Sequence, residues 1–346
     1  MYQLLAETQV NPVKWNDDVM RLNGCAFHSH EWSVFSSEKG CTNPVYLSLR
    51  DRGGNPVALA IGFQTSKSVF GKNLFKTISF GSFPAANGSS AVVQMVQAIY
   101  NFSQDNSFMV LSMNSFGTPG NTDILNEMGF ITKKRWEFIL DLQIDKDQLW
   151  KTLPENKRRL INKAKKQGVI VKKGETLVDF LSFRDLALAT KERKENEGIQ
   201  FPVADAQYYS LLKDMVLDKG VGLLYLAFLN GDCIGGSFFA KFNQRAYYQS
   251  SAATDRGLEA AAPHLIVWEA ITDLKGEDFR ILNLGGVSEG ELQGRPLEEA
   301  GLYIFKKRFA TTVIPCYKGE LCLRPKSFRL YSLLKRLKEF TAQDSN

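Results

Sequence analysis

The sequence predicts a mixed α/β fold built as two successive units of similar design, and three observations support this. The chain has 346 residues, 44% of them apolar and 23% charged, which is the balance of a globular protein with enough chain for two cores. One order of elements fits both halves: helix, antiparallel hairpin, central strand, helix, strand, helix, strand. No run of eighteen apolar residues occurs, so a membrane span is not expected.

The first unit is predicted over residues 1–145. Residues 17–37 have the periodicity of a helix that is broken near Gly24. Two apolar runs, 46–49 and 57–63, flank the turn sequence DRGG and predict a hairpin. The remaining elements are a helix over 90–105, the strand FMVLSM, a short helix that ends at Gly129 and a strand pair at 136–142.

The pattern restarts in a second unit, predicted over residues 146–325. Its first helix has Pro154 in its first part and Gly168 as its C-terminal cap. The later elements are helices at 176–196 and 205–219, a hairpin across Asn230-Gly231-Asp232, a strand at 247–251, a helix over 259–275, the strand ILNLGG, a helix over 298–309 and a closing strand at 311–323. Residues 326–346 are predicted to form an amphipathic helix and a tail.

Composition argues against several classes of protein. The N-terminal MYQLLAETQV lacks the basic start and apolar centre of a signal peptide, so we expect a cytoplasmic protein. Five cysteines without a CxxC pair indicate separate reduced thiols. With three histidines and neither an HExxH nor a GxSxG motif, we expect no metal site and no hydrolase triad.

The net charge of +6 is mild, so the placement of the basic residues is more informative than their sum. Residues 157–173 contain eight Lys or Arg and no acid. A second basic group surrounds Lys306-Lys307-Arg308 and continues from Arg324. Either group can meet phosphate, and either is also explained as the solvated face of a helix.

Five segments form an ordered set of motifs over most of the chain: FHSHEWSVF, VFGKNLFKTISFGSF, RRLINKAKKQGVIV, ILNLGGVSEGELQG and GLYIFKKRFA. In order and spacing they resemble the FemAB-like family, the peptidoglycan interpeptide-bridge aminoacyltransferases and their relatives. The resemblance implies two tandem GNAT-type (acyl-CoA N-acyltransferase-like) domains with a cleft between them. It also implies transfer of an acyl or aminoacyl group to an amine of a cell-wall or surface-polysaccharide precursor.

Lys306 is the first candidate for a catalytic residue. It matches the lysine of the family's YxFK motif, which lies where donor and acceptor meet, with Phe305 and Tyr303 beside it. A cation at this point also has a physical purpose, because aminolysis of an ester or thioester passes through an oxyanion that a fixed positive donor stabilises. The alternative is an exposed basic helix face in which Phe305 and Phe309 pack at i and i+4.

The segment after strand ILNL offers further candidates for substrate contact. Gly285-Gly286 permits close approach of the backbone to a bound group, and equally a simple tight turn. Ser288 and Glu289 follow, and the Glu289 carboxylate could take the proton of the attacking amine. A solvated loop carboxylate is the alternative for Glu289.

Three residues of the first unit are candidates for acceptor binding. His28 and Trp32 stand at i and i+4 on the predicted helix and could line a groove; the alternative is a core tryptophan with a satisfied histidine. Asn114, at the end of strand FMVLSM, stands where the family carries an acidic residue at the acceptor. The resemblance thus places the acceptor amine near Trp32 and Asn114.

The sequence departs from the family where its peptidoglycan-precursor enzymes bind a nucleotide diphosphate. The family's lysine after the motif tryptophan is replaced by Val34 or Phe35, and its loop arginine by Phe201. The segment 174–205 also has no room for the helical arm of some cell-wall members. An acceptor of another kind, or a loss of activity, would explain these departures.

No tightly bound cofactor is expected, and the donor is aminoacyl-tRNA or acyl-CoA. The stretch SAATDRGLEAAAPHLIVW has only Gly257 where a coenzyme A enzyme has a glycine-rich pyrophosphate loop, which favours charged tRNA. A tRNA needs a positive surface for its phosphates. The candidates, at helical spacing, are Lys157, Arg158, Arg159, Lys163, Lys165 and Lys166.

Three other functions fit parts of the sequence. One is an acyl-CoA-dependent N-acyltransferase that acts on an amino sugar or small metabolite. Another is a catalytically inactive nucleic-acid or membrane-surface binder; the C-terminal SFRLYSLLKRLKEF aligns Phe328, Tyr331, Leu334 and Leu337 beside basic residues, as an interfacial helix does. A helix docked on its own protein explains the same apolar stripe. A third is an acyltransferase that uses this tail for peripheral contact with the inner membrane surface. DNA is not an expected partner.

Overall fold

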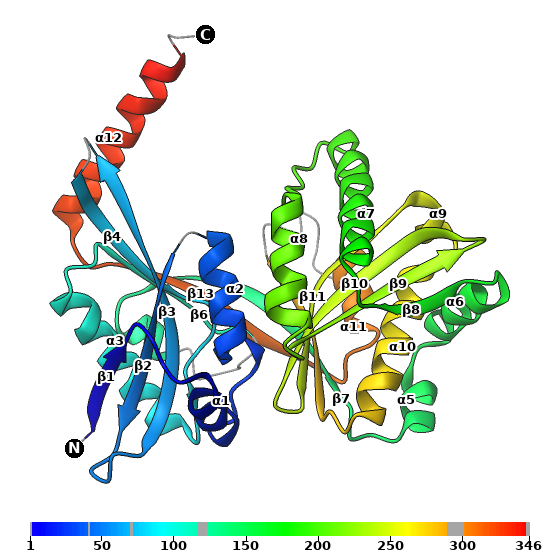
Figure 1. The fold of residues 1–346 in the computed structure, drawn as a ribbon, viewed down its shortest axis with the longest axis horizontal. Coiled ribbons are helices and arrows are strands. Elements are labelled where there is room, and N and C mark those ends of the chain that lie inside the picture. The colour runs from blue at the N-terminus through cyan, green and yellow to red at the C-terminus, as the bar shows by residue number, and fades with distance from the viewer. Residues whose placement is uncertain (1, 41, 70–71, 117–122, 289–300, 344–346) are drawn as a thin grey trace. The chain divides into compact units, whose positions relative to one another are not determined.

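The computed structural model describes residues 2–40, 42–69, 72–116, 123–288 and 301–343, which form two compact units (Figure 1). Unit 1 consists of Met1–His28, Gly40–Arg135 and Pro315–Asn346, and unit 2 of Ser29–Lys39 and Trp136–Ile314. Neither unit is one continuous stretch, whereas the predicted ranges 1–145 and 146–325 divide the chain once. None of the described helices is long and apolar enough to cross a membrane.

The sheet of unit 1 has the strand order β1-β2-β3-β4-β6-β13. Consecutive strands from β1 to β4 pair antiparallel, β4 pairs with β6 in parallel, and β6 pairs with β13 antiparallel. The predicted hairpin is β2 and β3. The strands are β1 (Gln3–Glu7), β2 (Asn43–Arg50), β3 (Pro56–Val69), β4 (Lys72–Phe80), the short β5 (Ala85–Ala86) paired with β3, β6 (Val110–Asn114) and β13 (Thr312–Cys322).

Helices cover both faces of this sheet because neighbouring residues of a strand point to opposite sides. On β2, the Tyr46 ring contacts Trp15 of α1 with the centroids 4.9 Å apart, while Leu47 joins the core cluster that includes Ile99 of α3. The helical elements of unit 1 are α1 (Pro12–Arg21), the 3-10 turn η1 (Ala26–His28), α3 (Ser89–Asp105), α4 (Asp123–Glu127) and α12 (Pro325–Gln343).

Unit 2 repeats this design. Its strand order is β8-β9-β10-β11-β12-β7, in which the strands from β8 to β11 pair antiparallel and β11 pairs with β12 in parallel. The predicted duplication is therefore present in the sheets. The strands are β7 (Ile131–Asp141), β8 (Ile170–Gly174), β9 (Gly222–Leu229), β10 (Asp232–Phe242), β11 (Arg245–Ala253) and β12 (Ile281–Ser288).

Two helices flank the unit 2 sheet on opposite faces, as Figure 1 shows for α7 and α10. On β10, a methyl group on Gly235 would contact Ile266 of α10, and one on Gly236 would collide with Phe183 of α7. Gly236 therefore lets α7 lie close to the strand, whereas the contact of Gly235 with α10 has room for a methyl group. The helices of unit 2 are α2 (His30–Gly40), α5 (Lys146–Thr152), α6 (Glu155–Lys166), α7 (Leu177–Asn196), α8 (Ala206–Leu212) with the π turn Lys213–Leu217, α9 (Asp255–Glu259), α10 (Ala262–Gly276) and α11 (Gly301–Lys307).

Several expected elements differ from the structure. The helix predicted at 17–37 is interrupted near Gly24, as predicted, but the interruption also contains the turn η1, with α1 before it and α2 after it. The helix predicted at 259–275 is divided into α9 and α10, and the strand predicted to close the sheet of the second unit is β13, which pairs with β6 of unit 1. Pro154 does not lie inside a helix but separates α5 from α6, since a proline cannot supply the amide that a continuous helix needs. The strand pair predicted at 136–142 is the single long strand β7.

Candidate functional site

Lys306 enters the interior of unit 2, while the two residues after it stay outside. Only 7% of Lys306 is exposed, whereas Lys307 and Arg308 are exposed. The Lys306 Nζ donates a hydrogen bond to the Gly286 carbonyl oxygen at 2.9 Å. An ammonium group withdrawn from water needs such acceptors, because desolvation of an unpaired ion costs on the order of several kcal/mol. Lys306 is therefore not part of a solvated basic helix face.

Gly285 lets β12 approach this lysine closely. Its φ of +74° lies in the left-handed region, within a strand rather than in a simple turn. A Cβ added there would lie 3.2 Å from Lys306 Nζ and 3.1 Å from the Tyr248 carbonyl oxygen. The Gly285 N–H donates to Asn283 Oδ1 at 2.8 Å, which holds this backbone conformation. The glycine pair is thus part of the surroundings of Lys306.

A buried carboxylate that sequence reasoning missed connects three strands next to this point. Glu137 on β7 is fully buried. One of its oxygens accepts from Asn283 Nδ2 at 2.7 Å, and the other accepts from the Tyr247 hydroxyl at 3.1 Å. The hydrogen bonds fix the Asn283 amide, which in turn orients Gly285. The sequence did carry a signal, because Glu137 interrupts the otherwise apolar run WEFIL.

A cavity of about 330 Å³ lies beside Lys306. The parallel pairing of β11 with β12 covers Arg245–Tyr247 and Ile281–Asn283, and the cavity begins at the next residue of β11, Tyr248. Its other walls come from α7, α10 and α11. The lining residues used below are Lys306, Phe305, Tyr248, Phe201, Leu258 and Pro263.

The two aromatic residues of the predicted motif have different surroundings. Phe305 is half-buried and lines the cavity. Tyr303 is buried and packs edge-on against Phe138 with the centroids 5.2 Å apart. Tyr303 thus contributes to the core of unit 2, whereas Phe305 is accessible to a molecule in the cavity.

Lys157 is buried, so the prediction that it belongs to an exposed positive surface is wrong. It is 1% exposed, and its Nζ lies 3.1 Å from His264 Nδ1 and 4.2 Å and 4.5 Å from the ring centroids of Phe305 and Phe309. Burial, with a smaller effect of Arg308, lowers the pKa of Lys157 to about 7. The spacing carried this information: Lys157 shares the inner face of α6 with Ile161 and Ala164.

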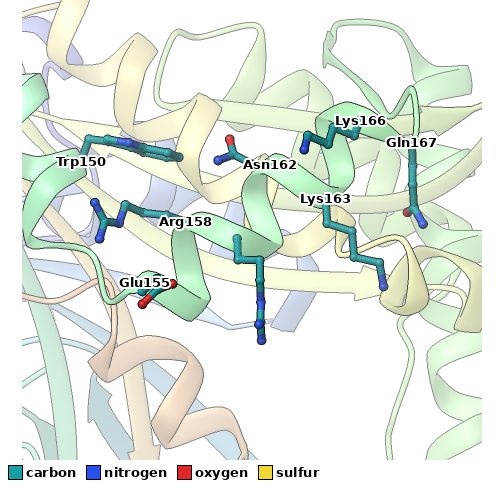
Figure 2. A pocket seen from close by; sticks show the side chains of 8 residues that line it. Trp150, Glu155, Arg158, Asn162, Lys163, Lys166 and Gln167 are labelled. Atoms are coloured by element: carbon teal, nitrogen blue, oxygen red, sulfur yellow. The ribbon is translucent and has the colours of Figure 1, made fainter.

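Four other basic residues of α6 do line an open pocket of about 590 Å³ (Figure 2), whereas Lys165 lies outside it and forms an ion pair with Glu269 at 3.2 Å. Arg158, Arg159 and Lys163, all predicted phosphate contacts, lie there together with Lys166 and the indole of Trp150. The Arg158 Nε is buried without a hydrogen-bond partner among the described residues. Such a pocket combines cations for phosphates with an aromatic ring on which a base can stack.

The segment between β11 and α10 does not form the amide cradle of a coenzyme A site. Thr254 caps α9, its hydroxyl accepts from Gly257 N at 3.1 Å, and the Leu258 amide donates to the Thr254 carbonyl at 3.0 Å. A side chain on Gly257 would collide with the Ile234 carbonyl, so packing of α9 on β10 explains this glycine. Two of the amides that could hold a pyrophosphate, those of Gly257 and Leu258, are thus used inside the protein.

His28 and Trp32 do not share a helix, contrary to the prediction. His28 ends η1 in unit 1 and is 1% exposed, while Trp32 lies on α2 in unit 2. The His28 Nδ1 accepts from the Cys25 amide at 3.2 Å, so Nε2 carries the proton and donates to the Phe83 carbonyl at 2.7 Å. Ser82 Oγ lies 3.0 Å from the same nitrogen. These contacts are those of a satisfied core histidine.

Trp32 is largely buried and forms an aromatic cluster with Phe35, one of the two residues predicted to replace a family lysine. Its ring lies 5.5 Å from Phe35, which lies 5.4 Å from Tyr208 of α8. The Phe35 side chain is fully buried, and Val34 is half-buried. Phe35, one of the two residues predicted to replace the family lysine, therefore takes part in the packing of α2 on α8.

Asn114 has an unusual environment at the end of β6 in unit 1. It pairs with Lys318 of β13, and its side-chain Oδ1 is buried without a hydrogen-bond partner among the described residues. A buried acceptor atom left unpaired costs about 1–3 kcal/mol, which a ligand donor would recover.

Ser288 is half-buried at the end of β12, and Glu289 lies outside the described residues. In the part of the chain that the structure describes, no group of three His, Cys, Asp or Glu side chains is arranged to hold a metal ion.

A model of the FemAB family matches residues 90–233 and 230–338. The crystal structure of FemX has a TM-score of 0.73 and 13% sequence identity, and the match covers 96% of this chain and 99% of that chain. Comparison with curated proteins gives no match.

Two further solved structures are similar. The tandem GNAT protein from the clavulanic acid biosynthesis pathway has a TM-score of 0.54 and 12% identity, with 94% of this chain and 99% of that chain covered. The C-terminal domain of a putative lysylphosphatidylglycerol synthetase from Agrobacterium fabrum has a TM-score of 0.55 and 10% identity, with 89% and 91% covered. At these identities the likeness shows the fold, which is that of tandem GNAT-type proteins.

Proposed function

The chain belongs to the FemAB family, and we propose that it transfers an aminoacyl group from charged tRNA to an amine of a cell-wall or surface-polysaccharide precursor. The family and the fold support an acyltransferase. The donor, the acceptor and the residue roles are our inference from the site.

The observation that carries the proposal is the buried Lys306 ammonium beside the cavity. The acceptor amine attacks the ester carbonyl carbon and the carbonyl oxygen becomes an oxyanion; the C–O bond to the carrier then breaks, and the carrier oxygen leaves as a hydroxyl with the proton that the amine nitrogen gives up as the amide forms. Lys306 is held by the Gly286 carbonyl, is itself largely buried, and can donate to that oxyanion where it borders the cavity. Phe305 lines the place of the acyl group.

The donor side is supported by the pocket on α6. Arg158, Arg159 and Lys163 offer phosphate contacts, and Trp150 offers a ring for a base of the single-stranded tRNA end. The occupied amides around Gly257 argue against coenzyme A as the donor. An acyl-CoA donor with an amino-sugar or small-metabolite acceptor is the alternative that the test must separate.

The acceptor side is supported by Asn114. Its unpaired buried oxygen can accept a hydrogen bond from an acceptor amine or amide. Because Phe35 is buried and Phe201 lines the cavity, we infer an acceptor that is not held by the family's nucleotide-diphosphate contacts.

The experiment that tests the donor is filter retention of a labelled aminoacyl-tRNA pool, with deacylated tRNA and acyl-CoA thioesters as separate competitors. We expect retention that survives deacylated tRNA and weakens with salt. Replacing Arg159 or Lys163 with Gln should each lower the salt slope by about one. No specific retention, or competition by acyl-CoA alone, would overturn the tRNA donor.

A peripheral membrane contact through α12 has its own observation. Tyr331 packs on Phe75 with the centroids 5.3 Å apart, yet Phe328, Leu330 and Leu333 remain exposed among exposed Lys and Arg residues. An interfacial helix has this composition. Sedimentation with anionic vesicles should fall when these three apolar residues become Ser; unchanged sedimentation would overturn the contact.

A further inference from the structure

The Phe305 ring, which lines the cavity beside Lys306, is also in contact with a second buried lysine. The Lys157 Nζ lies 4.2 Å from the centroid of Phe305 and 4.5 Å from that of Phe309. His264, near the start of α10, completes the cluster: its ring lies 5.1 Å from Phe305 and its Nδ1 3.1 Å from Lys157. Three helices, α6, α10 and α11, thus meet around one ammonium group.

Burial of the Lys157 ammonium group costs free energy that a role in packing alone does not explain. Lys157 occupies the face of α6 that buries Ile161 and Ala164, where an apolar side chain would fit without desolvation of a charge. An aliphatic side chain of similar length would also be free of the repulsion between the Lys157 ammonium and the neighbouring positive charge of Arg308. A position that breaks the apolar pattern next to a cavity suggests a function rather than stability.

We propose that Lys157 is a positioning residue for Lys306: its contacts with Phe305, Phe309 and His264 fix α11 against α6 and α10, so that Lys306 stays on the Gly286 carbonyl. Lys157 itself does not line the cavity. It acts through Phe305, which precedes Lys306 in the chain. The consequence for turnover rests on the proposed function, whereas the consequence for the Lys306 side chain does not.

The contact of Lys157 with the rings of Phe305 and Phe309 should depend on pH, because the charge of Lys157 does. Among the described residues, the titratable and charged groups that act on Lys157 are His264 of α10 and Arg308, which directly follows α11. Burial, then the charges of Lys157 and Arg308, lower the pKa of His264 to about 3, so its ring is neutral and can accept from the ammonium. Above a pH of about 7 Lys157 loses its proton and with it the cation–π attraction to both rings.

The test compares Lys157→Met, which removes the charge with an unbranched side chain only one atom shorter, with the control Lys151→Met on the exposed surface of α5. Acetic anhydride at limiting concentration acetylates Lys306. Mass spectrometry measures the rate of this acetylation in each protein, and the rates are compared as the ratio of variant to wild type. We expect a ratio of at least about three at pH 6. At pH 9 the ratio should approach one, because Lys157 of wild type is then uncharged and its contacts with Phe305 and Phe309 are already weak. A ratio of one at both pH values would overturn the proposal.

A second variant keeps the test decisive if Lys157→Met does not fold. Phe309→Leu removes one of the two rings and should raise Lys306 labelling at pH 6 in the same direction. Unchanged labelling of Lys306 in this variant would contradict the proposal that Lys157 and these rings hold Lys306 in place.

Turnover separates this inference from the proposed function. At pH 6, with the labelled aminoacyl-tRNA pool as donor and hydroxylamine as a simple amine, Lys157→Met should lower kcat about tenfold and leave the donor KM unchanged. If wild type forms no hydroxamate, the proposed donor is wrong, and the labelling ratio still decides the role of Lys157. Wild-type turnover with an equally active Lys157→Met would overturn the positioning role.

Discussion

The two units share one strand order but use their buried polar groups differently. In unit 1, His28 is enclosed by the Cys25 amide, the Phe83 carbonyl and Ser82, so each ring nitrogen has a protein partner. In unit 2, the buried Lys306 lies beside a cavity, and the buried Lys157 is held only by rings and a neutral imidazole among the contacts described above. Both units thus contain satisfied buried polar groups, such as His28 in unit 1 and Glu137 in unit 2, and unit 2 also buries two lysines at or near a cavity.

This difference teaches how to separate structural from functional polar residues. A group whose hydrogen bonds are satisfied inside the core should cost stability when it is removed, and leave the chemistry intact. A desolvated cation at a cavity should behave in the opposite way, because its removal relieves the desolvation and ends the chemistry. The following substitutions test this contrast.

The largest loss of stability is expected for His28→Ala. The substitution leaves the Cys25 amide and the Phe83 carbonyl without their partner in the core, at about 3 kcal/mol in total. Urea unfolding measures this loss, and the turnover of the folded fraction should not change. A stable His28→Ala protein with lost turnover would move His28 into the site and break the contrast.

A smaller loss, about 2 kcal/mol, is expected for Gly285→Ala. The alanine must adopt a φ of +74°, and its methyl group would crowd Lys306 Nζ and the Tyr248 carbonyl. Turnover should fall as well, because the methyl group displaces the catalytic lysine. Gly276→Ala, at the end of α10 in open space, is the matched control and should be neutral or stabilising.

The smallest expected effect is a rise in the free energy of unfolding with pH that is caused by Lys157. The folded-state pKa of Lys157 is lowered to about 7, so from there up to the ordinary lysine value the unfolded chain holds a proton that the folded chain lacks. The free energy of unfolding should therefore rise with pH in this window, by at most about 1.4 kcal/mol per unit. Lys157→Met should remove this rise. A variant with the wild-type slope would mean that another group titrates.

The sequence predicted the repeated order of elements because hairpins and amphipathic helices are encoded locally, as in the DRGG turn between β2 and β3. It did not predict that β13, at the end of the chain, pairs with β6 of unit 1. Such a pairing is set by long-range contacts, which local periodicity does not contain. Pro154 was assigned to a helix because proline is tolerated in a first turn, and only the geometry of α5 and α6 shows a break.

The site was predicted unevenly for similar reasons. The family motif led to Lys306, and the structure adds that it is buried on the Gly286 carbonyl. Within the basic run on α6, counting charges could not separate the buried Lys157 from the pocket-lining Arg158, Arg159 and Lys163. The helical phase of Lys157 with Ile161 would have done so. Glu137 was missed because no motif contains it, although it is a lone acid in an apolar strand.

The most direct measurement for the central claim is the rate of hydroxamate formation from charged tRNA and hydroxylamine by wild type and by Lys306→Met, with Lys307→Met as the exposed neighbour. We predict a loss on the order of 100-fold for Lys306→Met at unchanged or raised stability, and a wild-type rate for Lys307→Met. Equal rates for Lys306→Met and wild type would contradict the claim that this buried ammonium stabilises the oxyanion.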